Sequence, residues 1–139
     1  MTIPCIKQWF QLAVPEPTDK NRAVQLGCHF EEVAEMLAAI GETVIAERLA
    51  LIATQYKKDS EVEINEPGLD RTELLDALCD QIVTAVGVAH MFGLDIEGAL
   101  VEVTRSNYSK FVDGKPTFDA NGKIAKPTTY SKPNLEQFV

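Results

Sequence analysis

The fold is decided by residues 18–41, which read TDKNRAVQLGCHFEEVAEMLAAIG. Apolar side chains recur there in steps of three and four, a period that places them on one face of an α-helix. These side chains are Leu26, Phe30, Val33, Leu37 and Ile40. Thr18 or Asp19 can cap the first turn, and Gly41 suits the left-handed position that ends a helix. The stretch therefore predicts one long helix with a core-facing stripe.

The same period indicates further helices on both sides of this stretch. We expect them at about residues 4–13, 42–57, 70–92 and 95–110. Asp70 or Thr72 can cap the helix at 70–92, and Asp95 can cap the last one. The expected core stripe of the helix at 70–92 is Leu74, Leu78, Ile82, Ala85, Ala89 and Phe92. Residues 59–68, closed by Pro67 and Gly68, have the composition of a loop.

The pattern changes after Phe111. Asp113-Gly114 and Asn121-Gly122 are turn signals, and residues 112–118 are expected to form part of a short hairpin. Nothing in the sequence alternates helices with parallel strands, so we predict an all-α fold. The prediction is a four- or five-helix bundle over residues 1–111, with residues 112–139 as an extended C-terminal arm of the same domain.

The composition excludes several classes of protein. The formal net charge of -8 would repel nucleic acid and anionic membrane surfaces, so neither is an expected partner. The sequence has no run of about 18 uninterrupted apolar residues and no signal-peptide pattern at its N-terminus. Its three cysteines form no CxxC pair and are expected to be reduced thiols. We therefore expect a soluble, cytoplasmic protein.

Acidic residues cluster on two of the expected helices. Glu31, Glu32 and Glu35 lie on the first, and Glu73, Asp76 and Asp80 lie on the helix at 70–92. Residues three or four apart share a helix face, so each set is a local anionic patch that a divalent cation would neutralise. A solvated outer face is the simpler reading. However, small and apolar residues such as Val24 and Cys28 adjoin the first set, which favours carboxylates that line a cleft.

Other metal sites fit the sequence less well. A di-iron carboxylate bundle needs a Glu-x-x-His pair on each of two helices, and neither His29 nor His90 stands three residues after an acid. Two isolated histidines also do not supply the usual ligands of a zinc hydrolase. No glycine-rich phosphate loop and no nucleophile motif is present.

The order of the acidic motifs resembles a known family. Glu31-Glu32-x-x-Glu35 followed by Glu73-x-x-Asp76 is similar to the EExxE and ExxD signature of the MazG-like all-alpha nucleoside triphosphate pyrophosphohydrolases. That superfamily includes dimeric dUTPases and phosphoribosyl-ATP pyrophosphohydrolase. The run from Arg105 to Lys110 and the two later turns resemble the end of one branch, so the resemblance extends over residues from about 20 to 133.

The resemblance implies an activity and a set of site residues. The expected reaction splits a nucleoside triphosphate, or its deoxy form, into a monophosphate and pyrophosphate, as nucleotide-pool house-cleaning. The expected cofactor is Mg²⁺, with Mn²⁺ as the alternative ion. The residues implied as metal ligands are Glu32, Glu35, Glu73 and Asp76, those implied as catalytic are Glu31 and Glu35, and those implied as substrate-binding are Arg105, Asn107 and Lys110.

Several alternatives stay open at this stage. Glu63 and Glu66 could replace the second acid pair by spacing, although a loop fixes ligands less rigidly than a helix. Asp80 can be a ligand or a surface residue. The chain could be a non-catalytic helical dimerisation or binding module, a relative that binds nucleotide without cleaving it, or a phosphoribosyl-ATP pyrophosphohydrolase. A homodimer is the expected assembly, and a tetramer is the alternative.

Overall fold

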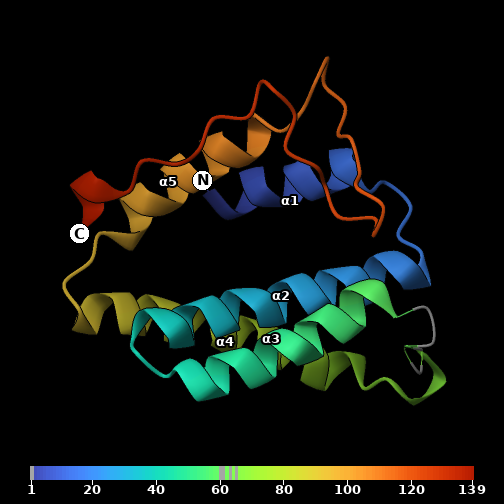
Figure 1. Cartoon of the computed structure of the whole chain (residues 1–139), viewed down its shortest axis with the longest axis horizontal. Helices are drawn as coiled ribbons and strands as arrows, with labels where there is room; N and C mark the ends of the chain where they lie inside the picture. Colours follow the sequence, from blue (N-terminus) through green and yellow to red (C-terminus); the bar gives the residue numbers. More distant parts are fainter. Residues whose placement is uncertain (1, 60–61, 63, 65) are drawn as a thin grey trace. The chain divides into compact units, whose positions relative to one another are not determined.

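The computed structural model describes residues 2–59, 62, 64 and 66–139 and has an all-α fold (Figure 1). Its α-helices are α1 (Thr2–Ala13), α2 (Asp19–Ala39), α3 (Thr43–Lys58), α4 (Arg71–Met91) and α5 (Ile96–Tyr108). Two short 3-10 helices, η1 (Glu66–Gly68) and η2 (Glu136–Phe138), complete the secondary structure. Over the described ranges the only β-type pairing is two isolated bridges. The predicted fold class is therefore confirmed.

The helix ends lie where the cap residues predicted them. Thr18 forms a capping box with Asn21 at the start of α2. Asp70 accepts hydrogen bonds from two backbone N–H groups of α4, and Asp95 accepts one from α5. Gly41 and Gly93 follow the ends of α2 and α4 with φ of 90° and 72°, a backbone conformation that glycine adopts without strain. Local capping chemistry thus fixes the lengths of the helices.

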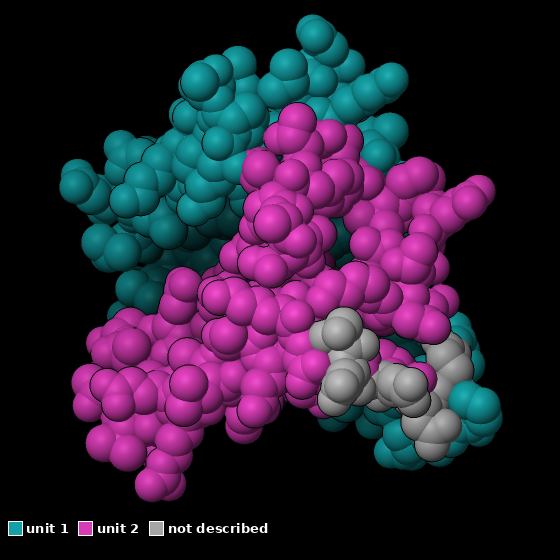
Figure 2. Space-filling model, turned by 45° about the vertical axis from the view of Figure 1, so that its right-hand side comes forward, with its two compact units in different colours: residues 1–12, 65–115, 126–139 teal, residues 13–64, 116–125 magenta. Residues whose placement is uncertain are grey.

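The described chain divides into two compact units, coloured separately in Figure 2. Unit 1 comprises residues 1–12, 65–115 and 126–139, and unit 2 comprises residues 13–64 and 116–125. The arm is accordingly divided between the units, because residues 116–125 belong with α2 and α3.

Unit 2 is built on an antiparallel hairpin of α2 and α3 (Figure 1). Its buried seam consists of small residues and one valine: Ala23, Val24, Gly27, Ala34, Ala46 and Ala53. A methyl group added at Gly27 would lie 2.7 Å from the carbonyl oxygen of Ala53, so the two backbones approach closely. The expected stripe on α2 is therefore only half-buried, and its last member, Ile40, is 58% exposed. The core-stripe prediction is therefore confirmed only in part: Phe30 packs on Tyr56 of α3 with 5.3 Å between ring centroids, but small residues make the closest approach.

Unit 1 has an aromatic cluster where α1 meets the end of α5. The Trp9 ring stacks on Phe111 with 5.5 Å between centroids, and its indole N–H donates to the carbonyl oxygen of Asn107 at 3.0 Å. The Tyr108 hydroxyl donates to the carbonyl oxygen of Cys5 at 3.0 Å. Both polar groups are bonded although Trp9 is buried, which is what makes such aromatic burial stable.

Turns in the arm follow the predicted signals. Asp113 and Gly114 have φ of 51° and 73°, as a tight type I′ turn requires, and Val112 pairs with Lys115 across them. In unit 2, Phe118 pairs with Ile124, and Gly122 at φ 80° turns the chain between them. Residues 112–118, expected to form part of a short hairpin, therefore contain one tight turn, and a second turn follows at 118–124.

Helix α4 leaves its apolar side chains uncovered. Leu75, Ile82 and Val83 are 64%, 52% and 67% exposed, and Leu74 and Leu78 are each 39% exposed. Of the expected α4 stripe only Ala89 is buried, so the core-stripe prediction for α4 was wrong. With a mean hydropathy of 1.3, α4 is long and apolar enough to cross a membrane by length and composition. Asp76 and Asp80 interrupt it, however, and a carboxylate in a bilayer core costs roughly 3 kcal/mol.

Candidate functional site

The first acidic motif lies in unit 2, where Glu31 of α2 is held by two lysines. Its Oε1 accepts from the Lys57 ammonium of α3, and its Oε2 accepts from the Lys123 ammonium of the 116–125 turn at 2.9 Å. The Glu31 side chain is 29% exposed and that of Lys57 only 13%, whereas that of Lys123 is 42% exposed. Two cations therefore share one carboxylate in a half-buried setting.

This arrangement changes the acidity of its members. Burial alone would raise the pKa of Glu31, but hydrogen bonds from Lys57 and Lys123 outweigh it and lower that pKa below its ordinary value. Burial would lower the pKa of Lys123, yet the bond to Glu31 raises it. Burial also raises the pKa of the neighbouring Cys28 thiol, against the opposing effect of the two lysines. Glu31 is thus an ionised carboxylate whose two oxygens are both in use.

Local structure positions Lys123 for this contact. The Asp119 carboxylate accepts from the backbone N–H groups of Asn121 and Lys123 at 2.8 and 3.0 Å, and the Asp119 N–H donates to the carbonyl oxygen of Lys123 at 2.8 Å. The turn is therefore closed by its own hydrogen bonds. Its backbone presents Lys123 to α2 from a sequence distance of 92 residues.

The other acids of this motif lie on the outside of α2. Glu32 and Glu35 are both exposed and stand three residues apart, so their carboxylates extend from adjacent turns of the helix. Glu31 lies on the side toward α3, and Glu32 is on a different side of the same helix. Of the three acids of the first motif, Glu31 is therefore partly buried, and Glu32 and Glu35 are exposed.

The second acidic motif lies in unit 1, on the first turns of α4. Glu73, Asp76 and Asp80 are exposed, and the backbone N–H of Glu73 is capped by Asp70 at 3.0 Å. Of the alternative acids, Glu66 opens η1, and Glu63 lies outside the described residues. The two motifs belong to different units. That their carboxylates share a metal ion stays a prediction.

Nowhere among the described residues do three side chains of His, Cys, Asp or Glu gather closely enough to hold a metal ion. The donor chemistry of each motif still suits magnesium, because exposed carboxylate oxygens are hard ligands that leave room for water and substrate. Glu31 does not fit as a ligand while both of its oxygens accept from ammonium groups. Glu31 was not among the metal ligands that the resemblance implies, and this geometry agrees with that.

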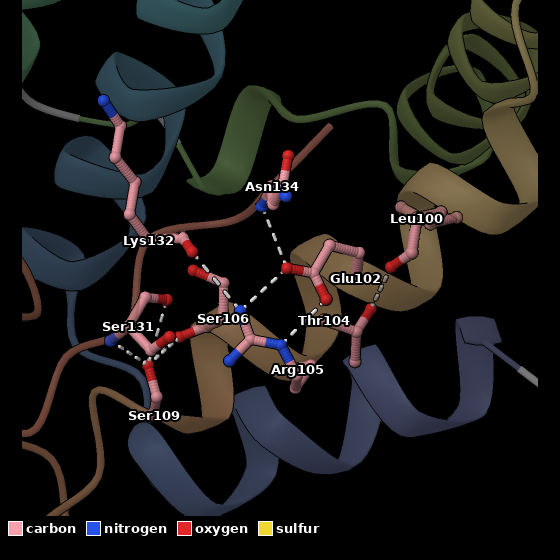
Figure 3. Close-up of polar contacts among 9 residues, drawn as sticks. All are labelled: Leu100, Glu102, Thr104, Arg105, Ser106, Ser109, Ser131, Lys132 and Asn134. Atoms are coloured by element: carbon pink, nitrogen blue, oxygen red, sulfur yellow. Dashed lines mark hydrogen bonds and ion pairs between the residues drawn. The ribbon is translucent and has the colours of Figure 1, made fainter. Parts of the chain in front are cut away.

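The residues expected to bind substrate lie at the end of α5, and all three have contacts within unit 1. Arg105 binds the Glu102 carboxylate through two nitrogens, each at 2.8 Å, and reaches the carbonyl oxygen of Lys132 (Figure 3). The Lys110 ammonium lies 5.8 Å from the centre of the Tyr130 ring. The backbone carbonyl oxygen of Asn107 accepts a hydrogen bond from the indole N–H of Trp9. Arg105 and Lys110 therefore hold the arm in this structure.

Glu102 is the centre of this arm contact. Its carboxylate also accepts from the backbone N–H of Asn134 at 2.9 Å, and the Ser109 hydroxyl accepts from the backbone N–H of Ser131 at 2.8 Å (Figure 3). The Arg105 hydrogen bonds, with that of Asn134, lower the pKa of Glu102 to about 2. These contacts attach residues 131–134 along α5.

An open hollow of about 350 Å³ also lies within unit 2. Its lining is mostly apolar and comes from the segment before α2 and from the 116–125 turn: Ala13, Val14, Pro15, Glu16, Asn21, Phe118 and Gly122. Gly122 immediately precedes Lys123. The same turn thus presents an apolar wall and a cation.

Sequence reasoning missed Lys57 and gave Lys123 no role. Lys57 stands in the last turn of α3, where a cation is ordinary because it complements the helix dipole. Nothing local in the sequence links either lysine to Glu31. Only the close packing of α2 on α3, set by Gly27 and Ala53, brings Lys57 to that carboxylate.

Comparison of this chain with models of protein families, with curated proteins and with solved structures gives no match.

Proposed function

We propose that this chain is a magnesium-dependent pyrophosphohydrolase that cleaves a nucleoside triphosphate, or its deoxy form, to the monophosphate and pyrophosphate. The reaction adds water across the anhydride between the first and second phosphorus atoms and releases pyrophosphate. The class requires positioning and charge neutralisation more than covalent chemistry, so carboxylates and a few cations suffice.

One observation carries the proposal. Within unit 2, the exposed carboxylates of Glu32 and Glu35 belong to the same helix as Glu31, one and four residues further on, and Glu31 holds the ammonium groups of Lys57 and Lys123. A polyphosphate that carries a divalent ion needs both kinds of charge side by side: anions for the metal and cations for the phosphate oxygens. An ordinary solvated face has no need of two lysines on one half-buried acid.

The motif acids take the roles that the resemblance gives them, except that Glu31 holds cations and does not activate water. Glu32 and Glu35 of unit 2, and separately Glu73 and Asp76 of unit 1, would bind magnesium through carboxylate oxygens. The ion, when bound, would neutralise charge on the triphosphate and on the departing pyrophosphate. Glu31 holds cations in place, and Glu35, whose carboxylate is exposed, is the acid that can also take a proton from water.

The test is a pyrophosphate assay with the purified chain, Mg²⁺ or Mn²⁺, and a panel of nucleoside and deoxynucleoside triphosphates. We expect release of pyrophosphate together with one monophosphate, and a loss of activity of about a hundredfold or more in Glu35→Gln. The matched control is Glu47→Gln, which removes an exposed acid of α3 and should leave the rate unchanged. Failure of every nucleotide with both metals, or full activity in Glu35→Gln, would refute the proposed chemistry.

A second function is favoured by the uncovered face of α4. A non-catalytic helical module would use that face to associate, and its acids would be ordinary surface groups. Thermal melting separates the two functions, because an ion that binds only the folded chain must raise its melting temperature. A rise at millimolar Mg²⁺ that Glu32→Gln removes supports the enzyme, and an unchanged melting temperature supports the module. Both functions are compatible with a homodimer, which is the assembly we propose.

A further inference from the structure

At the Glu31 contact, more than one ammonium group meets a single carboxylate. One carboxylate is matched by two ammonium groups, and Lys20 adds a third cation nearby by donating to the carbonyl oxygen of Lys57 at 2.9 Å. The Lys57 side chain is less exposed than that of Lys123, so water screens the charge of its ammonium group less well. Three ammonium groups therefore lie in this part of unit 2, and the charge of Glu32 also acts on Lys123.

The contact is also more elaborate than a structural ion pair requires. A single lysine satisfies a half-exposed carboxylate, and fixing a second long side chain costs conformational entropy. The turn that carries Lys123 is nevertheless closed by four hydrogen bonds that involve Asp119, which hold the lysine backbone in position. Such preorganisation is useful when a second anion replaces or joins the first.

We propose that Lys57 and Lys123 bind phosphate oxygens of the polyphosphate substrate, and that Glu31 holds their ammonium groups in place when no phosphate is bound. This inference rests on the proposed function and adds to it the residues that receive the anion. The ligand class is a chain of two or three phosphates, free or attached to a nucleoside. Lysine serves such a ligand as a mobile point charge that exchanges one oxygen partner for another.

The proposal gives Glu31 an effect that a purely structural acid would not have. Because Glu31 competes with phosphate for the same ammonium groups, Glu31→Gln should strengthen the binding of inorganic triphosphate in the absence of metal. A structural role predicts the reverse or no change, since losing the acid would only loosen Lys57 and Lys123.

The experiment is calorimetric titration of the full chain with inorganic triphosphate, with and without Mg²⁺. We expect Lys57→Met and Lys123→Met each to weaken binding about tenfold or more, because each removes a charge-assisted hydrogen bond. Lys58→Met is the matched control, since it removes an exposed cation from the same turn of α3, and it should change the affinity less than about twofold. Circular dichroism checks that each variant is folded, and Lys123→Met, in an exposed turn, provides the test should Lys57→Met unfold.

The outcomes separate this inference from the proposed function. Triphosphate binding that depends on both lysines, in a chain that releases no pyrophosphate from any nucleotide, would uphold the inference and refute the function. Normal hydrolysis with unchanged KM in both lysine variants would uphold the function and overturn the inference. Equal affinity of wild type, Lys123→Met and Lys58→Met for triphosphate would also overturn it, as would weaker metal-free binding by Glu31→Gln.

Discussion

At the scale of single residues, ion pairing gives Glu31 a pH-dependent share in stability. Its pKa is lowered in the folded chain, so the contribution is fully present above the unfolded value near 4.5 and is lost as the pH falls through the folded pKa. We expect Glu31→Gln to cost about 1 kcal/mol at pH 7, a modest value because solvent screens the group. Urea unfolding of both chains between pH 7 and pH 3 should show the difference shrinking on acidification. A difference that grows toward pH 3 would contradict this assignment.

A second residue, Glu102, should govern how firmly the arm lies along α5. Its pKa is lowered to about 2 by Arg105 and by the Asn134 N–H, so the contact is complete above pH 4.5 and weakens as the pH approaches 2. Glu102→Gln should increase amide hydrogen exchange in residues 131–134 at neutral pH. Glu97→Gln, at an exposed acid of the same helix, is the control and should leave that exchange unchanged. Equal protection in both variants would show that other contacts hold the arm.

At the scale of helices, glycines of α2 and α4 should respond to alanine in opposite directions. A methyl group at Gly27 would meet the Ala53 carbonyl oxygen and the Lys57 side chain, both at 2.7 Å, so Gly27→Ala should destabilise the chain by about 1–3 kcal/mol. Gly87 has no neighbour within 4 Å, so Gly87→Ala should stabilise it by about 0.5–1 kcal/mol through helix propensity. Chemical denaturation measures both. Stabilisation by Gly27→Ala would refute the close approach of α2 and α3.

The helices themselves could be predicted from sequence because their signals are local. The cap at Thr18 and the stop at Gly41 bracket an α2 that runs from Asp19 to Ala39, and Asp70 and Gly93 bracket α4 in the same way. Which face packs could not be predicted, because hydrophobicity alone favours Leu26 over Gly27. The value of a small residue appears only when a second backbone lies against it.

The candidate site, like the fold, could be predicted only where its sequence signals are local. Acids three or four residues apart were recognisable on single helices, and Glu32 and Glu35 do stand on adjacent turns. The partners of Glu31 could not be anticipated, since Lys57 and Lys123 lie 26 and 92 residues away and carry no local signature. Arg105 was expected to bind substrate, but its guanidinium pairs with Glu102, three residues earlier on α5. Spacing identifies which charges share a helix and leaves open which charges meet.

At the scale of the whole molecule, the face of α4 indicates association. Large apolar side chains that are half exposed on a charged chain mark surfaces that a protein partner covers. We expect light scattering at micromolar concentration to give twice the chain mass of 15.3 kDa. Leu75→Glu should shift the chain toward monomer, whereas Ile3→Glu, at a similarly exposed position of α1, should not. A wild-type monomer would contradict the homodimer, and partition into lipid vesicles would favour a membrane as the cover of α4.

The burial of Trp9 gives this protein a built-in optical reporter. Trp9 is the only tryptophan in the sequence, and it is enclosed between Phe10 and Phe111 at the junction of α1 with α5. Its emission should move to longer wavelength when that junction opens, with no signal from α2 or α3. Far-ultraviolet dichroism averages over every helix, so a midpoint that differs between the two signals would reveal a folding intermediate without any label being introduced.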